Sequence, residues 1–212
     1  LAEVLQLAKI LTPKTVIVHA DNLDTLEKEL GLPCVLKLPD SSFSVGVKKV
    51  QTSAELKAEV DRMLSESELV IAQEYLPTTF DWRIGILDGK PLFACQYFMA
   101  KGHWQIYNWH GEKEDIMGEY ATIPVEHAPP AIVEAALKAT NLIGDGLFGV
   151  DLKEIDGKPY LIEVNDNPNI DVGVEDNVLK DELYVRIIQA LKTRIEAKLG
   201  IAHAAQPSSR PV

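Results

Sequence analysis

Residues 147–169 read L-F-G-V-D-L-K-E-I-D-G-K-P-Y-L-I-E-V-N-D-N-P-N, and this stretch is the most informative part of the 212-residue sequence. Two apolar segments flank I-D-G-K at 155–158, a pattern typical of a tight turn between antiparallel strands. Glu163 and Asn165 are two residues apart on the second strand, so their side chains project from the same face. Asp151 lies on the first strand and joins that face only in one strand register.

The length of the turn is expected to decide this register. A two-residue loop at Asp156-Gly157 would pair Val150 with Glu163 and turn Asp151 toward the opposite face. A three-residue loop ending at Gly157, formed by a type I turn and a glycine bulge, would bring Asp151 onto the face of Glu163. The sequence I-D-G-K suits this second loop, because glycine readily adopts the left-handed conformation of the bulge.

With that loop, Asp151, Glu163 and Asn165 bring three oxygen-bearing side chains together at the end of the sheet. Carboxylate and amide oxygens are hard ligands, which suit Mg²⁺ or Mn²⁺ and not zinc. The alternative is the polar outer face of an ordinary hairpin. The apolar residues before Glu163 and the polar turn D-N-P-N after Asn165 favour the metal site.

The composition indicates a globular protein and excludes several classes of partner. Hydrophobic residues make up 46% of the chain and charged residues 25%, while the formal net charge is −11. A nucleic-acid partner is not expected, because such proteins show a basic face. No segment approaches the roughly 20 apolar residues of a membrane span, and no signal peptide is recognisable. Cys34 and Cys95 lie in apolar runs and indicate buried thiols in a reducing cytoplasm.

Hydrophobic spacing divides the chain into two α/β regions and a tail. Residues 12–65 follow the order β, α, β, loop, β, α, and the last helix begins with a capping box from Thr52 to Glu55. Residues 100–118 have no clear assignment. The other expected elements are helices over 1–11, 129–143 and 180–199, a strand over 70–76, and hairpins over 82–99 and 147–165.

Several segments before the hairpin have features suited to a nucleotide. Lys37 lies in the apolar strand C-V-L-K-L, where a charged side chain needs a partner such as a phosphate oxygen. The alternative is an edge-strand lysine that keeps the strand from pairing with a wrong partner. The small-residue loop S-S-F-S-V-G-V at 41–47 would let backbone amides approach phosphates, although a plain hairpin turn explains it equally well. The strand end I-A-Q-E-Y-L-P at 71–77 would present backbone groups to adenine, with Glu74 near the ribose, or is simply the exit into a linker.

Basic and amide side chains of the second region are candidates for catalysis. Arg83 in D-W-R suits bidentate contact with phosphate, or it forms a surface pair with Asp81. Lys101 and Asn108 lie in an aromatic-rich stretch that is equally compatible with a solvated loop.

The order of these segments resembles the ATP-grasp superfamily. The resemblance rests on Lys37, S-S-F-S-V-G-V, Q-E-Y-L, D-W-R, G-V-D-L and L-I-E-V-N-D-N-P-N. Within it, the chain is most similar to the branch of ribosomal-protein glutamate ligases and glutathione synthetases. The resemblance implies an α+β fold with antiparallel sheets in two lobes that sandwich the nucleotide. Residues 1–75 would form the small lobe, residues 76–200 the large lobe, and residues 201–212 a flexible tail.

The resemblance also implies a role for each candidate residue. Lys37 would contact the α- and β-phosphates, and Arg83 the transferred phosphate or an acyl phosphate. Asp151, Glu163 and Asn165 would hold one or two Mg²⁺ ions, and Asn167 would stand on the substrate side. Lys101 and Asn108 stand where close relatives often carry an arginine and an asparagine, and they are assigned to catalysis and to nucleotide binding. The flap would comprise Ser44, Val45, Gly46 and Val47, and the adenine site Gln73, Glu74, Tyr75 and Leu76.

The implied activity is an ATP- and magnesium-dependent carboxylate–amine ligase that acts on an amino acid or peptide through an acyl phosphate. The family usually adds a lysine at the opening of its first helix and a domain before it, so we expect an upstream domain to be absent from this chain. A cytoplasmic location and a homo-oligomer are compatible with this activity. The alternatives are a nucleotide-binding module without independent activity, a small-molecule kinase of the same superfamily, and an α+β interaction domain that binds no nucleotide.

Overall fold

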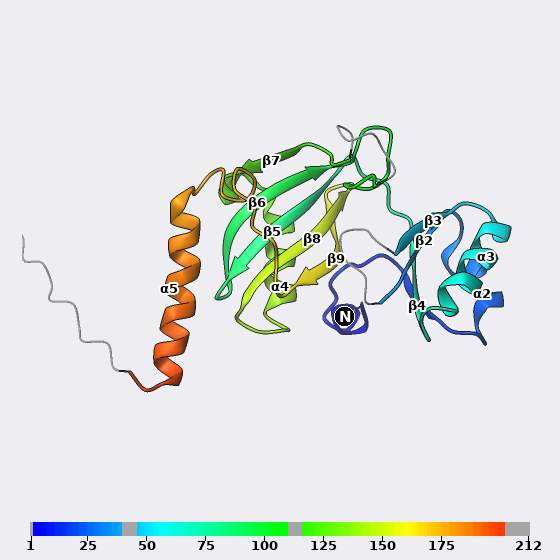
Figure 1. Ribbon diagram of the computed structural model, residues 1–212, viewed down its shortest axis with the longest axis horizontal. Coiled ribbons are helices and arrows are strands. Elements are labelled where there is room, and N and C mark those ends of the chain that lie inside the picture. Colours follow the sequence, from blue (N-terminus) through cyan, green and yellow to red (C-terminus); the bar gives the residue numbers. More distant parts are fainter. Residues whose placement is uncertain (1, 40–45, 110–115, 202–212) are drawn as a thin grey trace, which may run out of the picture.

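The computed structural model describes residues 2–39, 46–109 and 116–201 and forms two lobes, each built on an antiparallel sheet (Figure 1). The predicted flap residues Ser44 and Val45 lie outside the described residues, as does the predicted tail from 202 onward. The helices of the described part of the chain include none that could span a membrane.

The small lobe contains a four-stranded sheet in the order β1-β4-β2-β3, with every neighbouring pair antiparallel. Its elements are β1 (Thr15–Val18), α2 (Leu23–Leu30), β2 (Cys34–Lys37), β3 (Val47–Val50), α3 (Ser53–Leu64) and β4 (Val70–Glu74). They confirm the predicted order β, α, β, loop, β, α. The capping box is present, since Thr52 Oγ1 accepts a hydrogen bond of 3.2 Å from Glu55 N.

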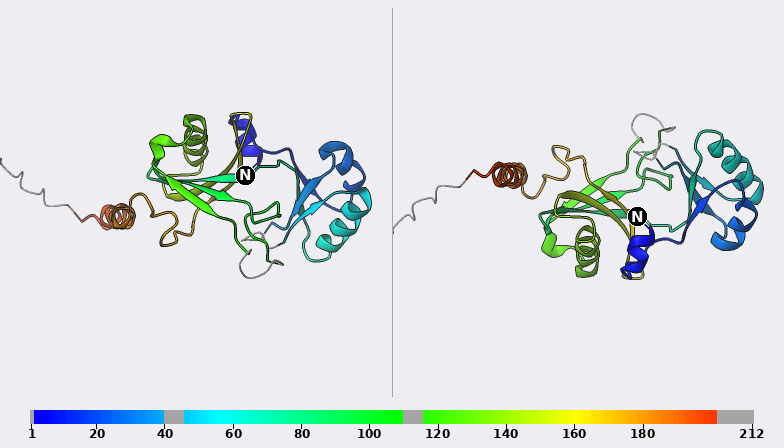
Figure 2. Two further views of the ribbon diagram at one scale, coloured as in Figure 1. Left: turned by 90° about the horizontal axis from the view of Figure 1, so that it is seen from above. Right: turned by 90° about the horizontal axis from the view of Figure 1, so that it is seen from below.

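Strand alternation gives the small sheet two different faces. Leu36 and Ala72 are buried under α2 and α3, which both cover the outer side of this sheet (Figure 2). Their neighbours Lys37, Ile71 and Gln73 therefore point to the opposite side, which faces the large lobe. The single lysine of this apolar strand thus lies on the inner face of the sheet.

The large lobe contains a five-stranded sheet in the order β7-β6-β5-β8-β9, again antiparallel throughout. Its strands are β5 (Phe80–Leu87), β6 (Lys90–Phe98), β7 (Tyr120–Ile123), β8 (Leu147–Ile155) and β9 (Lys158–Asn165). A 3₁₀ turn, η2 (Val125–His127), leads to α4 (Pro130–Thr140), which packs on one face of the sheet. Strand β7 follows the segment that the sequence left unassigned.

The first helix, α1 (Ala2–Leu7), belongs to the core of the large lobe, although the sequence assigned residues 1–75 to the small lobe. Leu5 and Ile10 pack in the cluster that also contains α4, and α1 and α4 lie on the same side of the large sheet (Figure 2). Leu161 N of β9 donates a hydrogen bond of 2.8 Å to Leu11 O. The chain thus contacts the large sheet before it enters the small one.

The last helix, α5 (Asp181–Lys198), packs on the opposite face of the large sheet, at the end distant from the small lobe (Figure 1). Leu183 and Ile187 are buried against Leu92 and Phe93. This helix covers only one end of that face, and the other end of the same face turns toward the small lobe.

Both hairpins of the large lobe close with two-residue Asp-Gly turns, so the predicted three-residue loop at 155–158 is wrong. Asp156 and Gly157 have φ values of 51° and 71°, and Ile155 pairs directly with Lys158. Such turns need positive φ at both central positions, which Asp and Gly tolerate. The predicted register is nevertheless correct near the site, because Ile162 forms a bulge and Asp151 then pairs with Glu163.

Candidate active site

A cavity of about 430 Å³ lies between the inner face of the small sheet and the facing end of the large sheet. Of the predicted site residues, its wall contains Lys37, Val47, Gln73, Glu74, Tyr75, Leu76, Asp151 and Glu163. The fold therefore brings together most of the side chains that the sequence assigned to a nucleotide. Apolar residues such as Val35 and Ile71 face polar ones across the same space, which suits a ligand with a flat ring and a charged tail.

Asp151 and Glu163 project into this cavity from directly paired positions of β8 and β9. Asn165 lies beside them, and its Nδ2 donates to Asp151 Oδ2 at 3.4 Å. Burial raises the pKa of Glu163 above its ordinary value, and the neighbouring Asp151 carboxylate raises it further. Two carboxylates held this close favour the binding of a cation.

The donor set of Asp151, Glu163 and Asn165 fits a hard divalent cation chemically, because all three offer oxygen. Among the described residues, no three His, Cys, Asp or Glu side chains form a metal-binding group, and the predicted set likewise has only two carboxylates. An ion held here would therefore need further ligands, and phosphate oxygens are the usual ones for Mg²⁺.

Arg83 forms a bidentate ion pair with Asp151, not with Asp81. Its Nε lies 2.7 Å from Asp151 Oδ1, and its Nη2 lies 2.8 Å from Asp151 Oδ2. Burial alone would lower the pKa of Arg83, but the Asp151 carboxylate outweighs it and raises that pKa. The two side chains meet because Arg83 of β5 and Asp151 of β8 are paired in the sheet.

A second ion pair lies next to the first on the same two strands. Lys153 Nζ is 2.6 Å from Asp81 Oδ1 and 2.7 Å from Thr78 Oγ1. Asp81 and Lys153 both line the cavity. Sequence reasoning missed Lys153, although its position two residues after Asp151 on one strand was a usable signal.

Lys37 approaches this acidic cluster from the small lobe. Burial lowers the pKa of its ammonium group, and the carboxylates of Glu163, Asp81 and Asp151 partly offset that shift. Lys37 thus lies across the cavity from the carboxylates, where an anionic group between them would be bound by the lysine and by a cation together.

The end of β4 and the residues that follow it line another part of the cavity. Gln73 Nε2 donates to Thr15 Oγ1 at 3.0 Å, which leaves the Gln73 side chain anchored within the small sheet. The rings of Tyr75 and Trp104 meet edge to face with centroids 5.8 Å apart. Lys49 Nζ lies 4.6 Å from the Tyr75 ring centroid, so aromatic side chains line this end of the cavity. The sequence assigned Tyr75 to the adenine site, whereas Trp104 lies in the segment that it left without an assignment.

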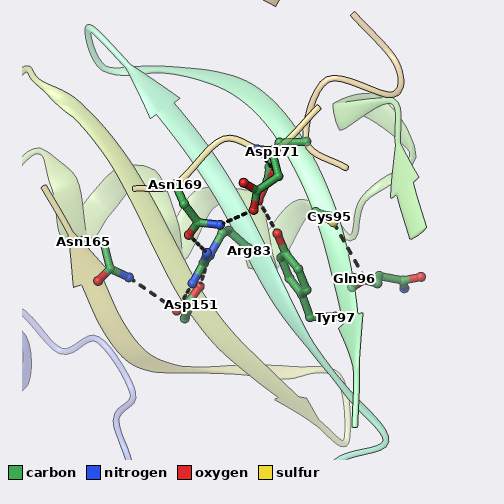
Figure 3. A network of polar contacts seen from close by, with 9 residues as sticks. Arg83, Cys95, Gln96, Tyr97, Asp151, Asn165, Asn169 and Asp171 are labelled. Atoms are coloured by element: carbon green, nitrogen blue, oxygen red, sulfur yellow. Dashed lines mark hydrogen bonds and ion pairs between the residues drawn. The ribbon is translucent and has the colours of Figure 1, made fainter. Parts of the chain in front are cut away.

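The substrate side differs in part from the sequence prediction. Asn167 is exposed, whereas its neighbour Asn169 accepts a hydrogen bond of 2.8 Å from Arg83 Nη1 (Figure 3). Lys101 is exposed, and Asn108 donates its backbone N–H to Ile116 O. Neither Lys101 nor Asn108 is among the side chains that line the cavity, so their roles stay predictions.

The comparison with protein families matches residues 4–173 to the family described as D-ala D-ala ligase C-terminus. Among curated proteins, the D-alanine–D-alanine ligase of Neisseria meningitidis serogroup B is 28% identical over 162 residues. That match covers 74% of this chain and 53% of the relative. The chain thus spans about half the length of the curated relatives it matches.

Solved structures show the same fold. The D-alanine–D-alanine ligase from Bacillus anthracis superposes with a TM-score of 0.74 at 24% identity, covering 92% of this chain and 67% of that one. The ATP-grasp ligase PsnB, solved with a minimal precursor, Mg and ADP, gives a TM-score of 0.65 at 16% identity, covering 90% of this chain and 56% of that one. These likenesses confirm the predicted α+β ATP-grasp fold.

Proposed function

The chain belongs to the D-ala D-ala ligase C-terminus family, and from this membership we propose that it carries the ATP- and magnesium-binding site of a carboxylate–amine ligase. The observation that carries the proposal is the convergence of Lys37 with Asp151 and Glu163 across one cavity between two sheets. These groups come from different lobes, and together they match the charge pattern of a metal–phosphate complex.

Each residue has a definite task in this proposal. Lys37 binds the phosphates of ATP, and the segment from Gln73 to Leu76 holds the adenine ring. Asp151, Glu163 and Asn165 hold Mg²⁺, which when bound neutralises phosphate charge. Arg83 orients the carboxylate substrate and stabilises the charge of the phosphoryl group.

The proposed reaction has two steps. A substrate carboxylate oxygen attacks the γ-phosphorus of ATP, which breaks the bond to the bridging oxygen and releases ADP. An amine then attacks the acyl phosphate, so that a C–N bond forms and inorganic phosphate leaves. The site contributes position and electrostatic stabilisation, and no protein nucleophile is needed.

Two groups of ligases suggest different substrates for this site. The D-W-R strand with Arg83 supports the branch of ribosomal-protein glutamate ligases and glutathione synthetases, whereas the curated relative named above is a D-alanine–D-alanine ligase. In both cases the acceptor and donor are amino acids or peptides.

The experiment is a screen of L- and D-amino acids for stimulated release of ADP and phosphate from ATP and Mg²⁺. The chain is tested alone and within the longest protein that contains it. We expect one amino acid or pair of amino acids to stimulate ADP release. Release of AMP and pyrophosphate would reject the acyl-phosphate mechanism. Stabilisation by ATP–Mg²⁺ without turnover in either form would favour a nucleotide-binding module.

A further inference from the structure

A chain of polar contacts connects Arg83 to the loop of residues 166–176 that follows β9. Arg83 Nη1 donates to Asn169 Oδ1 at 2.8 Å, and Asn169 Nδ2 donates to Asp171 Oδ2 at 2.8 Å. Figure 3 shows these side chains lined up above the sheet, with Asp151 on the other side of the guanidinium group. The loop therefore contacts the same arginine that the carboxylate of β8 holds.

The contacts return to Arg83 through Glu175 and Tyr97. Asp171 N donates to Glu175 Oε2 at 2.8 Å, and the Tyr97 hydroxyl donates to Glu175 Oε1. The Tyr97 ring in turn lies below the guanidinium group, with Arg83 Cζ 5.3 Å from its centroid. Arg83, Asn169, Asp171, Glu175 and Tyr97 thus form a closed ring of contacts.

Glu175 is an unusual residue to find at this place, because its side chain is fully buried. A buried carboxylate costs free energy unless hydrogen bonds compensate, and an apolar residue of similar size would often be as stabilising. Both carboxylate oxygens of Glu175 are used, one on the loop backbone and one on β6. These two contacts fix the backbone of the loop relative to Tyr97 of β6.

We propose that Glu175 and Tyr97 are positioning residues: they hold the loop of residues 166–176 and the guanidinium group of Arg83 in one fixed arrangement for the phosphoryl-transfer step. The inference rests on the proposed function, because it takes Arg83 as the residue that meets the reacting groups. Arg83 would otherwise be oriented only by Asp151, which is also a metal ligand in that proposal. The ring gives the arginine a second, independent set of contacts.

The chain offers a matched pair of variants for the test. Tyr97→Phe removes the hydroxyl that binds Glu175 but keeps the ring below Arg83. Tyr184→Phe removes the hydroxyl that donates to Asp176 Oδ2 at 3.0 Å, a contact on the adjacent carboxylate that lies outside the ring. Each variant loses one tyrosine hydroxyl bound to a loop carboxylate, and of the two only Tyr97 belongs to the ring around Arg83. Tyr97 also lines the cavity and is the more buried of the two tyrosines.

Two measurements are made on the full chain and on the longest protein that contains it. The first is ADP release with the amino acid that the screen identifies, with kcat and the KM for ATP determined separately. The second is the NMR signal of the Arg83 Nε–H and the hydrogen-exchange rate of the Asp171 amide. We expect Tyr97→Phe to lower kcat roughly 10- to 100-fold, as supporting contacts of an active site commonly do. The KM for ATP should change less than about twofold, because ground-state binding of ATP is retained.

Tyr97→Phe should also shift the Arg83 signal and speed exchange at Asp171, while Tyr184→Phe should leave all four quantities at wild-type values. An unchanged kcat in Tyr97→Phe overturns the proposal, and so does an equal loss in Tyr184→Phe. If the wild-type protein releases no ADP with any amino acid, the proposed function fails. In that case the NMR measurement by itself tests the positioning role, and an Arg83 Nε–H signal that does not shift in Tyr97→Phe overturns it.

Conservative replacement of Glu175 gives a second test that does not depend on tyrosine. Glu175→Gln can still accept from Asp171 N and donate to the Tyr97 oxygen, whereas Glu175→Ala removes both contacts. We expect Glu175→Gln to retain kcat within about threefold of wild type and Glu175→Ala to lose at least as much as Tyr97→Phe. Equal kcat values for the folded Gln and Ala variants would contradict the positioning role.

Discussion

The two hairpins of the large lobe contain the same turn sequence, D-G-K-P, yet the second presents a directly paired couple of carboxylates to the cavity, whereas the first presents only Asp81. Each closes with a two-residue turn, and each has one unpaired residue on its second strand, Leu92 in the first and Ile162 in the second. Arg83 is paired with Cys95 in the first hairpin, and Asp151 with Glu163 in the second. The same turn therefore occurs in both hairpins, and the candidate site depends on which side chains occupy the paired positions beside the cavity.

The two bulges lie at different distances from their turns. Leu92 lies close to its turn and contributes to the apolar cluster under α5, whereas Ile162 lies farther along its strand and lines the cavity. In both hairpins the extra residue on the second strand changes which of the following residues project from the same face as their partners on the first strand. Four experiments separate what each hairpin contributes.

The largest effect is expected for Glu163→Ala in the second hairpin. Loss of a metal ligand should lower ADP release more than about 100-fold, because the charge of the phosphates is no longer neutralised. The fold should stay intact, since the Glu163 side chain lines the cavity and is not part of the hydrophobic core. Turnover is measured beside Lys90→Ala, which changes an exposed residue of the first hairpin. An active Glu163→Ala enzyme would remove the metal assignment.

In the first hairpin, Gly85→Ala should mainly reduce stability. A Cβ at this position would come within 2.3 Å of the Phe93 ring, which is buried between the hairpin and α5. Overpacking of this kind costs roughly 1–3 kcal/mol in the free energy of unfolding. Denaturant titration measures this loss, and a double variant with Phe93→Leu should recover part of it. No change in the unfolding midpoint would show that the ring moves freely.

The matched change in the second hairpin is Gly149→Ala, because Gly149 is paired with Gly85 across β5 and β8. Here the added Cβ would meet Pro168 Cβ at 2.8 Å and Arg83 Cδ at 3.8 Å. The loop after β9 should shift, and turnover should fall about tenfold with a smaller loss of stability than in Gly85→Ala. Unfolding and ADP release are measured on the same samples. A variant that loses stability but keeps full kcat would contradict this division between the hairpins.

The smallest effect is the pH dependence of Glu163. Its pKa is raised in the folded protein, so its contribution to stability is present below its ordinary pKa of 4.5 and is lost as the pH rises through the raised value. A metal needs the ionised form, so Mn²⁺-dependent ATP binding should weaken as the pH falls through the same range. Calorimetry between pH 4.5 and 7 measures this binding. In thermal unfolding, Glu163→Gln should gain stability relative to wild type as the pH rises.

The sequence by itself determined the order of the elements and identified the charged and strand-end residues that converge on the cavity, among them Lys37, Asp151 and Glu163. Strand alternation separated Lys37 from the core residues beside it, and the spacing of Glu163 and Asn165 assigned them to one face. Those rules are local, because the position of a side chain relative to its strand depends only on the neighbouring backbone. The predicted ATP-grasp fold needed the order of these segments in addition, and the solved relatives confirm it.

Only the tertiary structure decided which side chains meet across strands and loops. The sequence left Arg83 with Asp81 as its nearest protein partner, whereas the pairing of β5 with β8 gives it Asp151. The bulge at Ile162 was not predictable from the turn, because it lies farther along β9, beside Leu161, whose N–H donates to Leu11 O of the N-terminal segment. Glu175 lies 78 residues from Tyr97, and a contact at that separation forms because the packed sheet holds both backbones in place.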